Sequence, residues 1–141
     1  MIVLDTNVVS EAFSRGGIDP RVLGWLNAQE PASLFLSTMV FAELWYGAHL
    51  VREPARREGL LQAIARVRGE YEGRILAFGE TAAEFYGRIA ATRRLAGRPI
   101  ETKDAMIAAI CMAHDATLAT RNVRDFAGLD LAVVNPFEAG A

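Results

Sequence analysis

Short apolar runs alternate along the chain with longer stretches in which apolar residues recur at helical spacing. Each short run is long enough for a buried strand and too short for a helix. The predicted strands cover residues 1–4, 34–36, 74–78, 117–120 and 131–134. Strands that alternate with helices in this way are typical of an α/β domain with a mainly parallel sheet.

Six helices are predicted between these strands from apolar periodicity and from residues that favour helix ends. They cover 8–13, 20–27, 38–51, a long segment that begins at 54, 81–95 and 103–114. Their predicted N-caps include Asp19, either Ser37 or Thr38, and Thr102, because short polar side chains accept hydrogen bonds from the free amides at a helix start. No repeat, low-complexity tract or linker interrupts the sequence pattern, so we predict one domain over residues 1–141.

Composition narrows the class of protein. Hydrophobic residues make up 52% and charged residues 23% of the sequence, which is a globular balance. The net charge of -2 excludes a protein that coats nucleic acid by bulk positive charge, so nucleic-acid binding would need a local basic patch or cations held by acidic residues. Cys111 is the only cysteine, Asp5 interrupts the apolar start, and no apolar run reaches membrane-spanning length. We therefore expect a cytoplasmic protein that does not enter a membrane.

Asp5 follows the first predicted strand directly. Ligands of parallel α/β sheets gather outside the carboxyl ends of the strands, so an acidic side chain at this position is well placed for chemistry. An aspartate after a strand is also a common turn former or helix cap. Asp5 alone leaves both interpretations open.

Glu43 and Asp104 lie on predicted helix faces that are otherwise apolar. The neighbours of Glu43 on its face are Met39, Val40, Tyr46 and Gly47, and those of Asp104 are Ile107, Ala108 and Cys111. Both carboxylates are therefore predicted to point inward, where a carboxylate needs a cation, a proton or hydrogen-bond donors. The alternatives are an ion pair between Glu43 and an arginine, and the ordinary preference of Asp104 for a first helical turn. Glu101 and Lys103 are interpreted as ordinary surface charges.

If Asp5, Glu43 and Asp104 converge in the fold, they repel one another unless their pKa values rise or a cation lies between them. Oxygen ligands with few histidines suit Mg²⁺ or Mn²⁺ rather than zinc. Such ions activate water and neutralise the charge that develops on a phosphodiester, so the predicted chemistry is phosphodiester hydrolysis.

Four motifs, in this order along the chain, resemble those of PIN domains. They are Ile2 to Asn7, Ser37 to Gly47, Asp104 to Ala109 and Leu118 to Phe126, and Val134 to Phe137 resembles the usual last strand. The likeness spans nearly the whole chain. Among PIN domains, the chain most resembles the ribonuclease toxins of the VapC and FitB-like type, which are components of type II toxin–antitoxin systems.

This resemblance implies a five-stranded parallel sheet in the order 3-2-1-4-5, flanked by helices. It also implies a metal-dependent endoribonuclease that cleaves tRNA or another structured RNA with water activated by Mg²⁺ or Mn²⁺. The implied partners are the RNA substrate, a cognate antitoxin that binds near the helices between Ser37 and Tyr71, and a second copy of the chain. By position, Asp5, Glu43 and Asp104 would bind the metal, Asn7 would orient Asp5 or a water, and Thr120 would help to position the water.

The fourth motif departs from part of the family. Some members carry an aspartate directly after Thr-Arg, where this chain has Asn122. Asp125 comes about one turn later, so the fourth position of the site is predicted to be filled either by Asp125 as a further acid or by Asn122 as a supporting residue. Arg121 and Arg124 flank this motif and are predicted to contact RNA phosphates.

Two other functions fit parts of the pattern. A phosphatase of the haloacid-dehalogenase type also begins with an apolar strand that ends in aspartate, although it usually has a second aspartate where this chain has Asn7. A catalytically inert PIN-like binding module is the other alternative, because Asn122 removes one negative charge from the site.

Overall fold

A single parallel sheet forms the middle of the protein. The computed structural model describes residues 1–138, so the last three residues of the domain predicted over 1–141 lie outside the described part. The strands are β1 (Ile2–Leu4), β2 (Leu34–Ser37), β3 (Ile75–Leu76), β4 (Thr117–Ala119) and β5 (Val133–Val134). All neighbouring strands are parallel and their order is β3-β2-β1-β4-β5, which confirms the predicted topology.

The two edge strands are shorter than predicted. The segments 74–78 and 131–134 contain only two strand residues each, Ile75–Leu76 and Val133–Val134. An edge strand pairs on one side only, so the ends of an apolar run can leave the ladder there. The central strands are instead paired on both sides, and Val3, Leu36 and Leu118 have no exposed surface.

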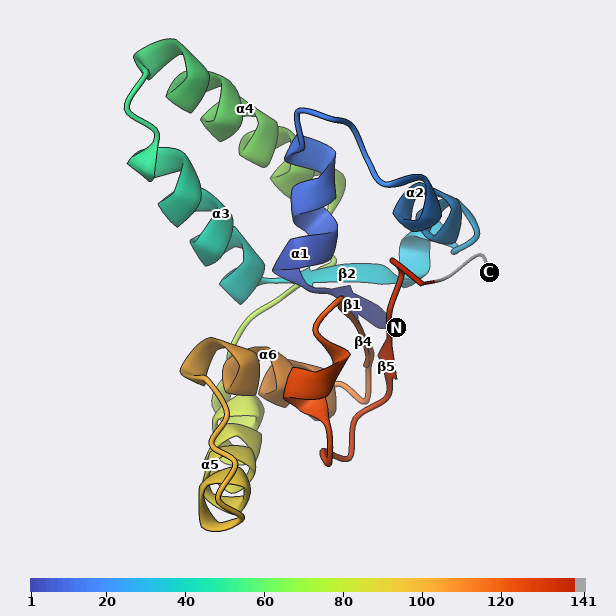
Figure 1. Ribbon diagram of the computed structural model, residues 1–141, viewed down its shortest axis with the longest axis vertical. Coiled ribbons are helices and arrows are strands. Elements are labelled where there is room, and N and C mark those ends of the chain that lie inside the picture. Colours follow the sequence, from blue (N-terminus) through green and yellow to red (C-terminus); the bar gives the residue numbers. More distant parts are fainter. Residues whose placement is uncertain (139–141) are drawn as a thin grey trace.

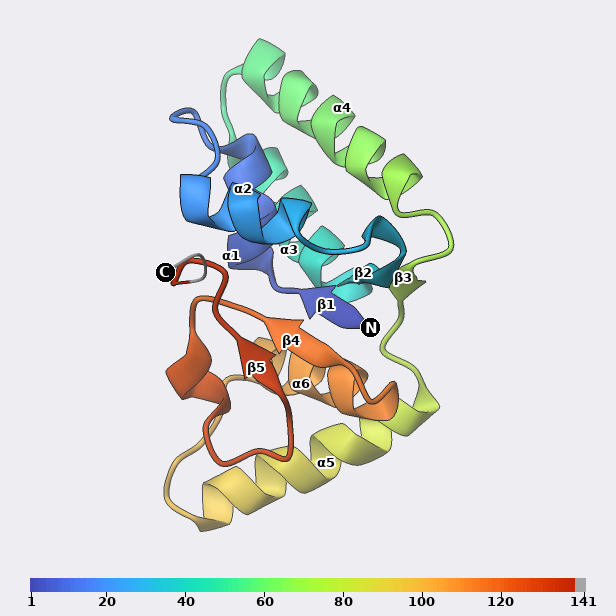
Figure 2. The same ribbon diagram turned by 90° about the vertical axis from the view of Figure 1, so that its right-hand side faces the viewer.

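Helices cover both faces of this sheet. They are α1 (Thr6–Val9), α2 (Pro20–Asn27), α3 (Thr38–Leu50), α4 (Pro54–Glu70), α5 (Glu80–Leu95) and α6 (Thr102–Ala113), with 3-10 turns at Ser10–Phe13, Pro31–Ser33 and Val123–Phe126. Figure 2 shows the sheet between a group formed by α1 to α4 and a second group formed by α5 and α6. In Figure 1 the α3–α4 pair extends away from the sheet, with the connection between the two helices at its far end.

The helix starts test the predicted caps. Asp19 accepts a hydrogen bond from a backbone amide at the start of α2, as predicted, and of the two candidates Ser37 and Thr38 it is Ser37 that does so for α3. The Thr102 cap is wrong, because Thr102 is the first helical residue and Glu101 stands in the cap position without a capping side-chain bond. The helix predicted over 8–13 is also wrong in its start, since Asp5 caps a helix that begins at Thr6.

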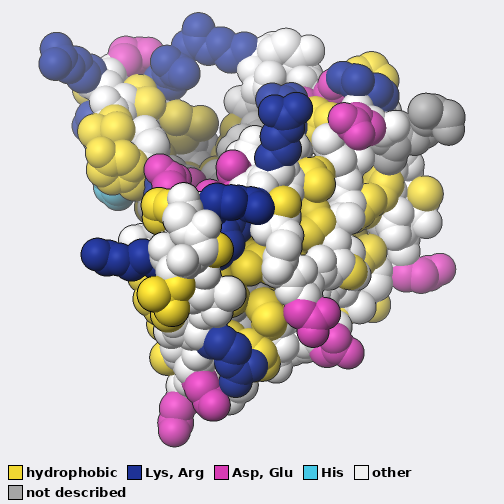
Figure 3. Space-filling view, turned by 60° about the horizontal axis from the view of Figure 1, so that its bottom comes forward, with side chains coloured by type: hydrophobic (Ala, Val, Ile, Leu, Met, Phe, Trp, Pro, Cys, Tyr) yellow, Lys and Arg dark blue, Asp and Glu magenta, His cyan; other side chains and the backbone are white. Residues whose placement is uncertain are grey.

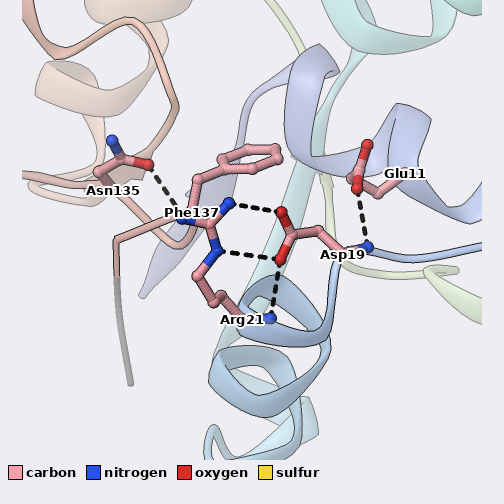
Figure 4. A network of polar contacts seen from close by, with 5 residues as sticks. All are labelled: Glu11, Asp19, Arg21, Asn135 and Phe137. Atoms are coloured by element: carbon pink, nitrogen blue, oxygen red, sulfur yellow. Dashed lines mark hydrogen bonds and ion pairs between the residues drawn. The ribbon is translucent and has the colours of Figure 1, made fainter. Parts of the chain in front are cut away.

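Polar contacts group at the start of α2 and, separately, in the C-terminal segment. The guanidinium of Arg21 donates to both carboxylate oxygens of Asp19, at 3.1 and 2.7 Å, and the backbone amide of Asp19 donates to Glu11 (Figure 4). The Phe137 ring lies beside this pair in Figure 4, and the guanidinium of Arg121 stacks on that ring at 3.8 Å. The C-terminal segment is thereby packed next to the loop that follows β4.

Two sequence expectations concern the interior and the membrane. Cys111 is fully buried in α6, and burial raises the pKa of its thiol to about 12, so the thiol stays protonated. Within residues 1–138, no helix combines the length and the apolar character needed to span a bilayer.

Candidate active site

An acidic pocket lies where the carboxyl ends of β1 and β4 meet the second turn of α3 and the first turn of α6. Its volume is about 310 Å³. The residues that line it are Asp5, Thr6, Asn7, Ser10, Glu43, Glu101, Lys103, Asp104, Asn122 and Asp125. Figure 3 shows acidic side chains in a hollow of the surface, with basic side chains on its margins. The fold therefore brings Asp5, Glu43, Asp104 and Asp125 to one place from four separate segments.

Asp5 both caps a helix and lines the acidic pocket. It is 5% exposed, and its Oδ1 accepts a 2.8 Å hydrogen bond from the Thr6 amide, which caps α1. Its Oδ2 accepts a 2.8 Å bond from the hydroxyl of Thr120, which follows β4 and is fully buried. The capping and the site interpretations of Asp5 are thus compatible, because each uses a different oxygen of the same carboxylate.

Asn7 connects Asp5 to the fourth motif. Its amide nitrogen lies 3.5 Å from Asp5 Oδ2 and donates to the Thr120 hydroxyl at 3.2 Å. Its carbonyl oxygen accepts a 3.0 Å bond from the Arg121 amide, while the Asn122 amide donates to Thr120 Oγ1. These bonds hold the segment after β4 against the segment after β1. The pocket residues that come from these two segments therefore keep fixed positions relative to one another.

Glu43 is half-buried in α3 and does not face the hydrophobic core. The prediction of an inward apolar face holds for Val40, which is fully buried, and is wrong for Tyr46, which is 70% exposed, and for Gly47, which is exposed as well. Glu43 Oε1 accepts a 3.0 Å bond from the Thr6 hydroxyl, and Oε2 lies 3.7 Å from the ammonium of Lys103. Its ion-pair partner is thus a lysine of α6 and not an arginine.

Asp104 lies in the first turn of α6, half-buried at the pocket wall. Ile107, Ala108 and Cys111 of its face are fully or almost fully buried, as predicted. Burial, followed by the negative charges of Asp5 and its neighbours, raises the pKa of the Asp104 carboxyl to about 6. Asp104 therefore carries a proton more readily than an ordinary aspartate near neutral pH.

The pKa of Asp5 is raised too. Burial is the largest cause, and the charges of Glu43 and Asp125 add to it, whereas hydrogen bonds from Thr120 and Thr6 lower the pKa. Asp125 is exposed in the 3-10 turn after β4 and faces the same pocket as Asn122. The neighbouring carboxylates thus destabilise the charged forms of Asp5 and Asp104, and a positive ion placed among them would relieve this repulsion.

The donor set fits a hard divalent cation. The pocket offers carboxylate, amide and hydroxyl oxygens, which Mg²⁺ and Mn²⁺ prefer, and neither histidine of the chain lines it. Within residues 1–138, no three Asp, Glu, His or Cys side chains are grouped so that they already hold a metal ion. The site is thus an open acidic pocket rather than a closed cage of ligands.

A second pocket adjoins the acidic one at the fourth motif. Arg121 and Arg124 line it together with Asn135, and it shares Asn122 and Asp125 with the acidic pocket. Arg121 and Arg124 are both exposed. Two cations beside an acidic centre form a short basic margin, although the net charge of the chain is negative.

Two residues of the site were missed by sequence reasoning. Lys103, interpreted as a surface charge, reaches Glu43, and its signal in the sequence was that it directly precedes Asp104. Arg93 of α5 donates to the backbone carbonyls of Arg98, Asp125 and Ala127. No sequence signal marks Arg93, because its acceptors are backbone atoms of a distant loop.

Comparison with known sequences adds to this geometry. The model of the PIN domain family matches residues 2–130. Plasmid stability protein StbB of Pseudomonas syringae pv. tomato is 39% identical over 140 residues, which cover 99% of this chain and 100% of the relative. VapC ribonuclease Y4jK of Sinorhizobium fredii is 38% identical, with 98% and 99% coverage. Toxin FitB of Neisseria gonorrhoeae is 35% identical, with 97% and 99% coverage.

Solved structures agree with the sequence relatives. The crystal structure of FitAcB from Neisseria gonorrhoeae contains a chain with a TM-score of 0.91 and 34% identity, and the match covers 98% of this chain and 99% of that one. A toxin–antitoxin complex from Klebsiella pneumoniae gives a TM-score of 0.73 at 25% identity, with 98% and 99% coverage. The similarity in both cases extends over essentially the whole of each chain.

Proposed function

Because this chain belongs to the PIN domain family, we propose that it is a metal-dependent endoribonuclease and the toxin of a type II toxin–antitoxin pair. Three relatives named as a stability protein, a VapC ribonuclease and a toxin support this proposal over nearly the full length of the chain. The proposed substrate is tRNA or another structured RNA.

One observation carries the enzymatic part of the proposal. Carboxylates from four segments, Asp5, Glu43, Asp104 and Asp125, line a single pocket at the carboxyl edge of the sheet. The pKa of Asp5 and of Asp104 is raised by burial and by the neighbouring acids. Grouped acids with perturbed pKa values in a cleft are typical of a functional site, because an ordinary fold gains nothing from such repulsion.

The roles of the residues follow from their positions. We assign Asp5, Glu43 and Asp104 to holding Mg²⁺ or Mn²⁺, which would activate water and neutralise charge on the phosphodiester. Thr120 and Asn7 keep the Asp5 carboxylate oriented through their hydrogen bonds. Asp125 is assigned to the fourth acidic position, with Asn122 beside it in the same pocket wall.

The basic margin is assigned to the RNA backbone. Arg121 and Arg124 line the pocket next to the acidic one, so they could contact phosphates on either side of the cleaved bond. Each such contact releases counterions, and RNA binding should therefore weaken as the salt concentration rises.

A partner protein is also part of the proposal. Leu4, Val8, Leu26, Leu36 and Val67 contribute to an apolar pocket of about 120 Å³ between α1, α2 and α4. An apolar side chain from an antitoxin would fit such a pocket, as a partner helix fits a hydrophobic groove. We also propose that two copies of the chain associate, since Tyr46 and Leu50 of α3 leave apolar surface exposed.

The enzymatic proposal is tested by cleavage of bacterial tRNA with the purified protein in Mn²⁺ and in EDTA. We expect cleavage in Mn²⁺ only, with 5′-phosphate and 3′-hydroxyl ends. Asp5→Asn and Asp104→Asn should abolish cleavage while circular dichroism shows an intact fold. Asp130→Asn is the matched control, because Asp130 is exposed and lies near the starts of β4 and β5, at the opposite edge of the sheet.

Three outcomes would contradict the proposal. Full cleavage by both site variants would remove the acids from the mechanism. No hydrolysis of any RNA, with no thermal stabilisation by Mn²⁺, would favour the inert binding module. A phosphoaspartate trapped on Asp5 would favour the phosphatase. For the biological role, loss of toxicity on expression of Asp5→Ala, together with an antitoxin gene next to this one, is the expected result.

A further inference from the structure

Lys103 is the only lysine in the sequence, and the other fourteen basic residues are arginines. It lies in the first turn of α6, directly before Asp104, and it lines the acidic pocket. Its ammonium nitrogen is 3.7 Å from Glu43 Oε2, and the two side chains are 58% and 27% exposed. The pocket thus contains one cation among five acidic side chains.

Both oxygens of Glu43 have a polar partner. Oε1 accepts from the Thr6 hydroxyl at 3.0 Å, so Thr6 orients the carboxylate without neutralising it. Oε2 faces the Lys103 ammonium, whose positive charge offsets the negative charge of the Glu43 carboxylate. An ion pair that is this exposed and longer than a hydrogen bond is weak, and it can be broken at small cost.

The choice of lysine matters for this pair. An arginine could grip both oxygens of a carboxylate in a fork, whereas an ammonium is a compact point charge on a flexible stem. The ammonium group can move from one anion to another, because its contact with an anion does not depend on a fixed geometry. Lys103 is therefore suited to a contact that is exchanged, in a chain that uses arginine at every other basic position.

We infer that Lys103 is the exchangeable counter-ion of Glu43: its ammonium neutralises this carboxylate in the metal-free protein, competes with the divalent ion for it, and turns to an RNA phosphate once the ion is bound. This inference rests on the proposed function, because it takes Glu43 as a metal ligand. It assigns Lys103 a positioning role that depends on charge, and it requires no bond to be made or broken.

The inference predicts opposite effects on the two ligands. Without the ammonium, Glu43 has no competing cation, so the pocket should bind a divalent ion more tightly. The same change removes a positive charge from the mouth of the pocket, so the phosphate backbone of RNA should bind less tightly. A residue with a merely structural role would weaken both kinds of binding or neither.

The single lysine permits a direct test on the wild-type chain. Reductive methylation with ¹³C-formaldehyde labels only Lys103 and the terminal amine and keeps their positive charge. Lys103→Arg lacks the Lys103 signal and so assigns the spectrum. On addition of Mg²⁺ at constant pH, the Lys103 methyl signal should shift with the same midpoint as the thermal stabilisation, while the terminal signal stays in place.

Two results of this titration are distinguishable. If Mg²⁺ stabilises the protein and the Lys103 signal does not move, the exchange is overturned and the proposed function stands. If Mg²⁺ neither stabilises the protein nor moves any signal, the metal site itself is overturned, and the inference falls with it.

Variants then measure the competition. Calorimetry with Mn²⁺ should show that Lys103→Met binds the ion about three- to tenfold more tightly than wild type, since one nearby positive charge is gone. Lys103→Arg keeps the charge and should bind Mn²⁺ no more tightly than wild type. Arg56→Met is the matched control, because Arg56 is exposed in the first turn of α4, at the far end of the α3–α4 pair (Figure 1).

Binding of unfractionated bacterial tRNA, measured in Ca²⁺, completes the test. Lys103→Met should bind tRNA about three- to tenfold more weakly than wild type, and a higher salt concentration should narrow this difference. Mn²⁺ affinity that is unchanged or lower in Lys103→Met overturns the competition. Equal tRNA binding by wild type and Lys103→Met overturns the transfer of the ammonium to phosphate.

Discussion

The Thr120 hydroxyl donates a 2.8 Å hydrogen bond to Asp5 Oδ2, across 115 positions of sequence. Both residues follow neighbouring strands, β1 and β4, at the carboxyl edge of the sheet. Because Asp5 is buried, this bond stabilises its charged form and lowers a pKa that burial raises. The same hydroxyl accepts from Asn7 and from the Asn122 amide, so Thr120 is the centre of the contacts that hold the site together.

Thr120→Val tests this relationship. Valine has nearly the same shape, but it removes the hydroxyl donor of a buried carboxylate and the acceptor of the Asn122 amide, and we expect a loss of about 1–3 kcal/mol in the free energy of unfolding. The loss is measured by urea denaturation at neutral pH. Thr117→Val, in the strand that precedes Thr120, is the control, since the Thr117 side chain is only half-buried. An equal loss in both variants would mean that the Asp5 bond contributes nothing specific.

The pKa of Asp104 predicts how stability depends on pH without divalent ions. Its pKa is 3.8 in an ordinary aspartate and about 6 in the folded protein, so between these values the folded state holds a proton that the unfolded state has lost. The free energy of unfolding should therefore fall as the pH rises from about 4 to about 6.

Asp104→Asn should remove much of this pH dependence. Because the carboxyl is only half-buried, solvent screening reduces the effect, and we expect the variant to be about 1 kcal/mol more stable than wild type at pH 8. At pH 4 the two proteins should differ little. Urea denaturation in EDTA at both pH values measures this. A variant that is less stable at pH 8 would contradict the assigned cause of the raised pKa.

Asn122 gives a third prediction. It lies in the wall of the acidic pocket beside Asp125, so Asn122→Asp adds a carboxylate to the site. We expect Mn²⁺ to bind about three- to tenfold more tightly, because another negative charge attracts the ion. In EDTA the variant should be less stable than wild type, since the new charge repels its neighbours. Calorimetry and thermal unfolding measure the two effects, and a variant with weaker Mn²⁺ binding would place Asn122 outside the metal's reach.

Arg93 gives a fourth prediction. Its guanidinium holds the turn that carries Asp125 through bonds to the carbonyls of Asp125 and Ala127, at 3.1 and 3.3 Å. Arg93→Gln should cost about 1 kcal/mol of stability, as expected for exposed hydrogen bonds to a charged group. Amide exchange should accelerate in the turn at residues 123–127. Arg94→Gln, next to it and exposed, is the control and should change neither quantity.

Much of the fold could be predicted from the sequence because the responsible interactions are local. Apolar runs marked the strands, and Asp19 was identified as a cap because its side chain binds an amide only two residues away. The cap of α3 was narrowed to Ser37 or Thr38 for the same reason, and Ser37 binds an amide three residues away. The order of the strands followed from the resemblance to PIN domains. Apolar neighbours along the helix likewise marked Asp104 as a half-buried carboxyl.

Other features were decided only by the tertiary structure. The short edge strands, the half-buried position of Glu43 at the pocket and the backbone acceptors of Arg93 depend on which distant segments lie beside them. Most of all, the contacts of Asp5 with Thr120 and of Glu43 with Lys103 join residues from different elements. The sequence by itself determined which side chains were available for the site. The packing of α3 and α6 at the carboxyl edge of the sheet decided which of them meet, because such contacts depend on distances in space that spacing along a chain does not specify.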